Sequence, residues 1–69
     1  MNGLKYVLPE GLSDRQYWAI VDDIQTIAKN GRLWPDVQVT FLPPNIASVS
    51  GSPVNLKKVE QLIDRWPKL

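Results

Sequence analysis

The chain of 69 residues contains no cysteine and no histidine. Without cysteine it cannot be a disulfide-stabilised secreted scaffold. Without histidine it lacks the usual base of a serine triad and the commonest protein ligand of transition metals. We therefore expect no metal ion and no cofactor.

Neither sign of charge dominates, because eight basic and seven acidic residues leave a net charge of +1. This balance does not by itself indicate a nucleic acid or an anionic membrane as the partner. Long apolar runs are also missing: MNGLKYVLPEGL at the N-terminus has no secretion-signal segment, and no run approaches the ~18 apolar residues of a membrane span. We expect a cytoplasmic protein with no membrane partner.

A chain of this length has room for one small domain, residues 1–69. Such a domain buries only about 60% of the surface of its unfolded chain, so we expect modest stability. Small domains often gain stability from disulfides, metals or self-association, and the composition removes the first and most of the second. We therefore consider two alternatives, a homo-oligomer and a domain that is stable alone.

Residues 13–31, SDRQYWAIVDDIQTIAKNG, have the pattern of an amphipathic helix. Ser13 and Gln16 have the spacing of a capping box, and Leu12 and Tyr17 that of a hydrophobic staple. Gly31 can adopt the left-handed conformation that closes a helix. The apolar stripe at helical spacing consists of Tyr17, Ile20, Val21, Ile24, Ile27 and Ala28. We predict a helix over 13–29 with four buried side chains: Tyr17, Ile20, Ile24 and Ile27.

Three short segments alternate between inward and outward positions, as strands do. They are residues 3–8, 37–42 and 46–50. Placing Leu42 opposite Ile46 sorts the last two segments into an apolar and a polar face, with Thr40 opposite Ser48 and Val39 opposite Val49. The intervening tip, 43–45, fits the common type I hairpin loop poorly because it has two consecutive prolines, and Asn45 is the residue best able to turn left-handed.

A second helix is predicted near the C-terminus, with Pro67 ending it. Its buried stripe is Leu56, Val59, Leu62, Ile63 and Trp66. Asn55 is the expected N-cap, and the alternative start has Ser52 as the cap and Pro53 as the first helical residue. Residues 51–53 could also offer free N–H groups to a phosphate, but they lack the repeated glycines of a phosphate loop, so capping is favoured.

The element order β-α-β-β-α predicts an α+β fold, a small two-layer sandwich with both helices on one face of a three-stranded sheet. The first strand, helix and second strand can form a parallel crossover. If the first strand does not pair, the alternative is an α-β-β-α unit.

The carboxylates do not form a recognisable catalytic pair. Asp22 and Asp23 are adjacent on the predicted helix and point about 100° apart, so they cannot converge on one atom. We therefore expect that the protein is not an enzyme.

Aromatic and apolar residues outside the predicted core indicate a different function. Trp18 lies roughly 120° from the centre of the helical stripe, and Trp34 lies in a connection. Surplus apolar surface on a small domain usually marks an interface. We expect a non-enzymatic protein-interaction module, a small regulator, adaptor or inhibitor, that binds a protein partner or itself. Its candidate binding residues are Trp18, Trp34, Leu42, Pro43, Pro44 and Ile46.

The alternative function is nucleic-acid binding through a basic flank of the second helix. Lys57, Lys58 and Arg65 form this flank, but Glu60 and Asp64 interrupt it. Phosphate affinity needs several unopposed cations, so this function is the less favoured of the two.

Overall fold

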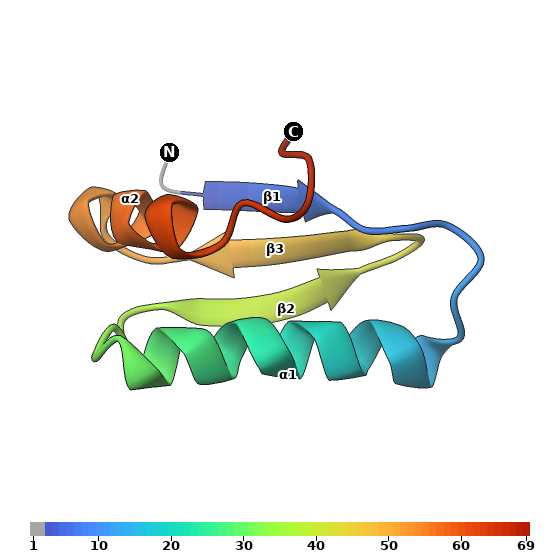
Figure 1. Ribbon diagram of the computed structural model, residues 1–69, viewed down its shortest axis with the longest axis horizontal. Coiled ribbons are helices and arrows are strands. Elements are labelled where there is room, and N and C mark those ends of the chain that lie inside the picture. Colours follow the sequence, from blue (N-terminus) through green and yellow to red (C-terminus); the bar gives the residue numbers. More distant parts are fainter. Residues whose placement is uncertain (1–2) are drawn as a thin grey trace.

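The computed structural model describes residues 3–69 (Figure 1). It confirms the predicted α+β fold and the order β-α-β-β-α, and because the first strand pairs, the α-β-β-α alternative does not apply. The elements are β1 (Gly3–Val7), α1 (Asp14–Asn30), β2 (Gln38–Leu42), β3 (Ile46–Ser50) and α2 (Pro53–Leu62).

The strand β3 occupies the centre of the sheet and is antiparallel to both of its neighbours, in the order β1-β3-β2. The outer strands β1 and β2 therefore run in the same direction. The crossover from β1 through α1 to β2 thus leaves a gap of one strand, and β3 fills it (Figure 1).

The predicted hairpin register is confirmed, with Leu42 opposite Ile46 and Thr40 opposite Ser48. The pairing of β1 continues the same sorting across β3, so one face of the sheet is apolar in all three strands. That face carries Leu4, Tyr6, Val39, Phe41, Ala47 and Val49. The expectation of a left-handed Asn45 is wrong, since within residues 3–69 the positive φ of a non-glycine residue belongs to Arg32.

Helix α1 begins with the predicted capping box. Ser13 Oγ accepts a hydrogen bond from the Gln16 N–H at 3.2 Å, and Gln16 Oε1 accepts one from the Ser13 N–H at 2.9 Å. The prediction of the buried side chains is correct for two of four residues. Ile20 and Ile27 are half-buried, because the centre of the stripe is rotated toward the opposite flank. The buried residues of α1 are Tyr17, Val21, Ile24 and Ala28.

The C-terminus of α1 closes one residue later than predicted. Gly31 has a φ of −83°, and Arg32 takes the left-handed conformation with a φ of 62°. The Arg32 N–H donates to Lys29 O at 3.0 Å and the Leu33 N–H to Ala28 O at 2.9 Å, which is the Schellman pattern. This turn directs Leu33 into the core. A Cβ on Gly31 would lie 3.4 Å from Leu62 Cδ1, so the glycine contributes space beside α2.

Helix α2 follows the alternative start, and the expectation of Asn55 as N-cap is wrong. Ser52 Oγ caps the helix by accepting from the Asn55 N–H at 3.4 Å, and Pro53 is the first helical residue. The helix ends at Leu62, four residues before the predicted end at Trp66. Two stripe assignments therefore fail: Leu62 is exposed, and Trp66 is half-buried in the chain beyond the helix.

Both helices bury their apolar stripes against the same sheet face, in one core cluster. Tyr6 lies at its centre with no exposed surface, and its hydroxyl donates to Ile63 O at 2.8 Å. The tail after α2 covers the outer edge of β1, where the Val7 N–H donates to Pro67 O at 2.7 Å and the Leu69 N–H to Lys5 O at 2.9 Å. Within residues 3–69, neither helix is long and apolar enough to cross a membrane.

One side chain of α1 covers the start of the outer edge of β2. Gln25 Nε2 donates to Val37 O at 3.1 Å, and Gln25 Oε1 accepts from the Val39 N–H at 3.1 Å. One amide group therefore satisfies two backbone groups of an edge strand, which would otherwise be available to another chain.

Arg32→Gly is expected to raise the free energy of unfolding by about 0.5–1 kcal/mol. A non-glycine residue in the left-handed region costs about 1–2 kcal/mol, and part of this gain is offset because glycine loses more conformational freedom on folding. Urea denaturation measures the change. Arg32→Ala keeps a Cβ at the same φ and should stay within about 0.5 kcal/mol of the parent. Equal stabilisation by both substitutions would contradict the assignment of the strain to φ.

Tyr6→Phe is expected to destabilise the fold by about 1 kcal/mol, since Ile63 O loses its buried donor. Burial, with smaller contributions from Glu60 and Asp64, raises the pKa of Tyr6 from 10.0 to about 12. A folded-state pKa above the unfolded one gives stability that is present below pH 10 and lost as the pH rises toward 12. Between these pH values, the free energy of unfolding should decrease more steeply with pH for the parent than for Tyr6→Phe. Parallel pH profiles would show that the hydroxyl is not responsible.

Candidate functional site

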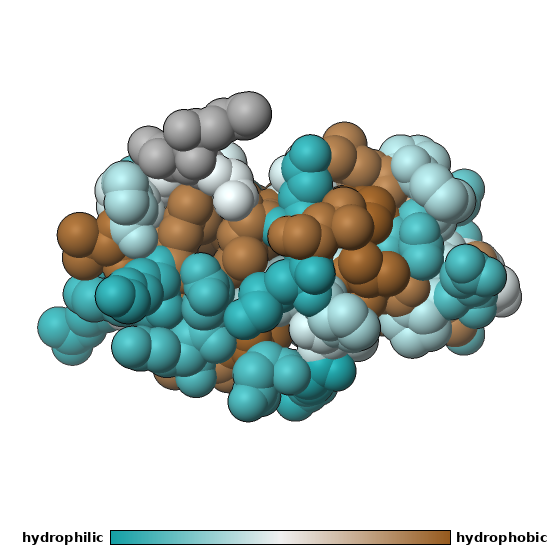
Figure 2. Space-filling view, turned by 90° about the horizontal axis from the view of Figure 1, so that it is seen from above, coloured by the Kyte–Doolittle hydropathy of each residue, from teal (hydrophilic) through white to brown (hydrophobic). Residues whose placement is uncertain are grey.

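The sheet face opposite the helices, here called the open face, carries side chains that are exposed or half-buried. At the hairpin end of this face, one residue from each strand forms an aliphatic row: Val7, Ile46 and Leu42 are direct neighbours in the register. The next row, Lys5, Ser48 and Thr40, is polar. The open face is therefore apolar at one end only. Figure 2, which looks onto the β1 edge, shows hydrophobic atoms right of centre and also toward the left end, between hydrophilic ones.

Trp18 lies at the same end of the molecule as the hairpin tip. Its side chain is 51% exposed and packs edge-to-face on Phe41, with 6.0 Å between the ring centroids. Phe41 also stacks on Tyr17 at 4.9 Å and directly precedes Leu42. The fold therefore places Trp18 at the hairpin end on the helix side of the sheet, whereas Leu42 and Ile46 point to the open face.

Trp34 does not join this group. It follows the C-terminus of α1, is 52% exposed, and has Lys29 Nζ 5.4 Å from its ring centroid. Trp18 lies near the other end of α1, eleven residues before Lys29, and this separation corresponds to about 16 Å of helix.

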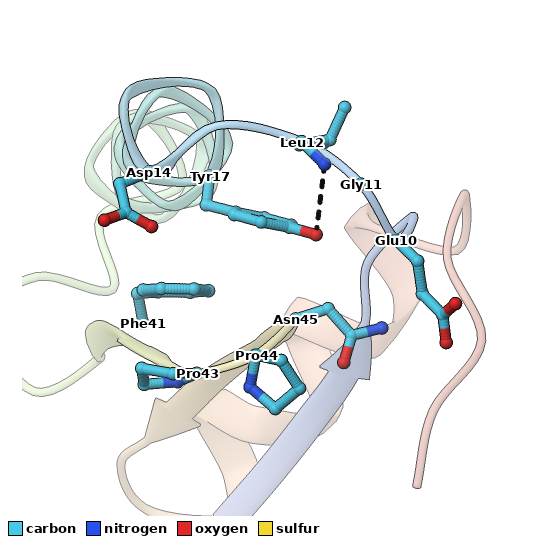
Figure 3. Close-up of a pocket in the computed structure, with 9 residues that line it drawn as sticks. All are labelled: Glu10, Gly11, Leu12, Asp14, Tyr17, Phe41, Pro43, Pro44 and Asn45. Atoms are coloured by element: carbon cyan, nitrogen blue, oxygen red, sulfur yellow. Dashed lines mark hydrogen bonds between the residues drawn. The ribbon is translucent and has the colours of Figure 1, made fainter.

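A pocket of about 460 Å³ lies between the loop that joins β1 to α1 and the tip of the hairpin (Figure 3). We call it the tip pocket. It is lined by Glu10, Gly11, Leu12, Asp14, Tyr17, Phe41, Pro43, Pro44 and Asn45. The two prolines were predicted to bind a partner, and sequence reasoning missed the other seven residues. No local signal could have identified them, because the two walls are distant in sequence and meet only in the folded chain.

Hydrogen bonds fix the two walls of the tip pocket to each other. Asn45 Nδ2 donates to Leu8 O at 2.8 Å, and Asn45 O accepts from the Leu8 N–H at 2.8 Å. On the helix side, the Tyr17 hydroxyl donates to Pro9 O at 2.7 Å and accepts from the Leu12 N–H at 3.4 Å. Gly11, at a φ of +82°, makes the turn between these contacts.

The basic residues of the alternative function are divided between two segments. Lys57 and Lys58 are exposed on α2, but Arg65 lies beyond its end, with its guanidinium carbon 5.4 Å from the ring centroid of Trp66. The prediction that all three share one helix flank is therefore wrong, because α2 ends early. Glu60 on α2 pairs with Lys68 at 3.6 Å.

The N-terminus of α2, considered above as a phosphate site, holds a carboxylate of the chain itself. Asp36 Oδ2 accepts from the Ser52 N–H at 2.9 Å and from Asn55 Nδ2 at 2.8 Å. These bonds, first of all the one from the Ser52 backbone, hold the pKa of Asp36 below its ordinary value of 3.8. The N–H groups and the positive end of the helix dipole thus stabilise an internal anion.

Within residues 3–69, no group of three or more potential ligand residues could hold a metal ion. Asp22 and Asp23 are both exposed on α1. Comparison with known protein families, with characterised proteins and with solved structures found no match for this chain. The function must therefore be argued from its surface.

Asp36→Asn is expected to lower the melting temperature at pH 7, because a neutral amide accepts the two hydrogen bonds less strongly. The lowered pKa means that this contribution is present above the unfolded-state pKa of 3.8 and is lost as the pH falls below it. The difference between parent and variant should therefore shrink between about pH 5 and pH 2. Asp23→Asn is the matched control and should leave the pH profile unchanged. A constant difference at all pH values would contradict a role for the Asp36 charge.

Proposed function

We propose that this chain is a protein-interaction module that binds a partner protein through the hairpin end of its sheet. The observation that carries the proposal is the aliphatic row of Val7, Ile46 and Leu42 on the open face. A solvated face of an antiparallel sheet normally carries polar side chains, as the neighbouring row does. Three adjacent aliphatic residues on that face are explained by a partner that covers them.

The apolar surface extends from this row around the hairpin tip. Pro43 and Pro44 follow Leu42 directly, and on the other side of β2 the exposed Trp18 packs on Phe41. Tryptophan is enriched among residues that dominate binding energy. We therefore define the proposed interface as Val7, Trp18, Leu42, Pro43, Pro44 and Ile46, and we leave out Trp34 because it lies at the far end of α1.

A second copy of the chain is one form that the partner can take. The aliphatic row lies on an exposed face, so two copies can bring their rows together about a twofold axis. We propose binding to a different protein as the principal function. Sedimentation at several concentrations distinguishes the two, because a homodimer forms in the purified protein without any addition.

The double variant Leu42→Thr, Ile46→Thr is expected to weaken partner binding at least about tenfold, since each side chain loses apolar groups worth about 0.8 kcal/mol per methylene when buried. Threonine remains β-branched and suits a strand, so the fold should persist. The measurement is a pull-down from extract of the source organism, followed by titration calorimetry with the purified partner. Trp18→Ala should weaken the same complex.

Gln38→Thr is the matched control, because it places the same residue on the open face at the polar end of β2. It should bind like the parent, and so should Trp34→Ala. If the double variant retains the parent's affinity while its melting temperature is unchanged, the aliphatic row is not the interface.

A further inference from the structure

We propose that the tip pocket binds a lysine or arginine side chain on the segment with which the partner docks. This inference rests on the proposed function and specifies the chemistry of the partner. The pocket lies at the hairpin tip on the helix side of the sheet, and Leu42 and Ile46 of the aliphatic row flank the tip in the chain and point to the open face. A partner that extends around the hairpin tip would contact both.

The walls of the tip pocket are apolar. The rings of Tyr17 and Phe41 lie one above the other at 4.9 Å, with the rings of Pro43 and Pro44 beyond Phe41 (Figure 3). Glu10 and Asp14 are the acidic residues of the lining; their carboxylates lie at opposite sides of the view, and that of Glu10 points away from the rings (Figure 3). None of the nine lining residues is cationic.

The charged side chains of the pocket are both anionic, namely the carboxylates of Glu10 and Asp14. The Tyr17 hydroxyl already donates to Pro9 O, and Asn45 Nδ2 already donates to Leu8 O. Within residues 3–69, neither Glu10 nor Asp14 forms an ion pair. A ligand that complements these carboxylates therefore supplies positive charge.

Lysine and arginine side chains combine the two properties that the pocket demands. Their methylene stems can lie along aromatic and proline walls while the charged head reaches a carboxylate at the rim. An anionic side chain would be repelled, and a purely apolar one would desolvate the carboxylates without a partner. The volume of about 460 Å³ accommodates such a side chain together with part of the backbone that carries it.

Hydrogen bonds within the chain hold the walls of the pocket in place. Both walls are tied together by the two hydrogen bonds between Asn45 and Leu8, and Tyr17 holds the loop above them. A site held in place before binding loses less conformational entropy when the ligand arrives.

The test uses blocked tripeptides as probes of the purified chain. Acetyl-Gly-Arg-Gly-amide is expected to shift the backbone amide signals of Gly11, Leu12 and Asn45 in ¹H–¹⁵N correlation spectra, with a Kd in the millimolar range. The same peptide with citrulline, which has the shape of arginine without its charge, should bind at least about threefold more weakly. Raising the salt from about 20 to about 300 mM should reduce this difference.

The double variant Glu10→Gln, Asp14→Asn should raise the Kd of the arginine peptide about fivefold. The matched control is Asp22→Asn, Asp23→Asn, which removes the same charge from α1 outside the pocket and should leave the Kd unchanged. Equal binding of the arginine and citrulline peptides, or an equal effect of both double variants, would overturn the proposal. Signals that shift with protein concentration in the absence of peptide would assign the pocket to a second copy and also overturn it.

The outcome is independent of the test of the proposed function. The tripeptides report on the tip pocket alone, whereas the threonine variants report on the aliphatic row. If the peptides fail to bind while Leu42→Thr, Ile46→Thr still loses the partner, only the assignment of the pocket falls.

Discussion

The pairing of β3 with both of its neighbours is the constraint on which the rest of the structure depends. Val49 lies opposite Leu4 on one side and Val39 on the other, and Ala47 lies opposite Tyr6 and Phe41. A shift of one residue in either pairing would move that strand's apolar residues to the open face. In both pairings apolar residues lie opposite apolar residues, so one face of the sheet is apolar in all three strands. Both helices bury their stripes against this face.

The edges of this small sheet are partly covered in three ways. The C-terminal tail pairs with β1, the Gln25 amide with the backbone of β2, and Asn45 with Leu8 at the hairpin end. Each satisfies backbone groups that would otherwise invite pairing with another chain. The surfaces left to a partner are therefore mainly side-chain surfaces, and one of the apolar ones lies around the hairpin tip.

In the proposed complex, the aliphatic row and the tip pocket would make different contributions to binding. Burial of the row supplies affinity with little selectivity, because the hydrophobic effect is not directional. The carboxylates of Glu10 and Asp14 would select among partners and orient them, since electrostatic complementarity contributes mainly to specificity and to the rate of association. An apolar surface beside an acidic pocket would thus favour partners in which a basic residue adjoins an apolar one.

The features that could be predicted from the sequence are those that depend on local interactions. The capping box of Ser13 and Gln16 and the register from Leu42 to Ile46 follow from spacing within short segments, and both are as predicted. Two predictions that failed lie where the chain meets other segments. Arg32, not Gly31, is left-handed just before Leu33 enters the core, and the Asn55 side chain bonds Asp36 instead of capping α2. The tip pocket is the extreme case. Its walls meet only because β1 pairs with β3, so tertiary structure alone decided that Glu10 and Pro44 line one cavity.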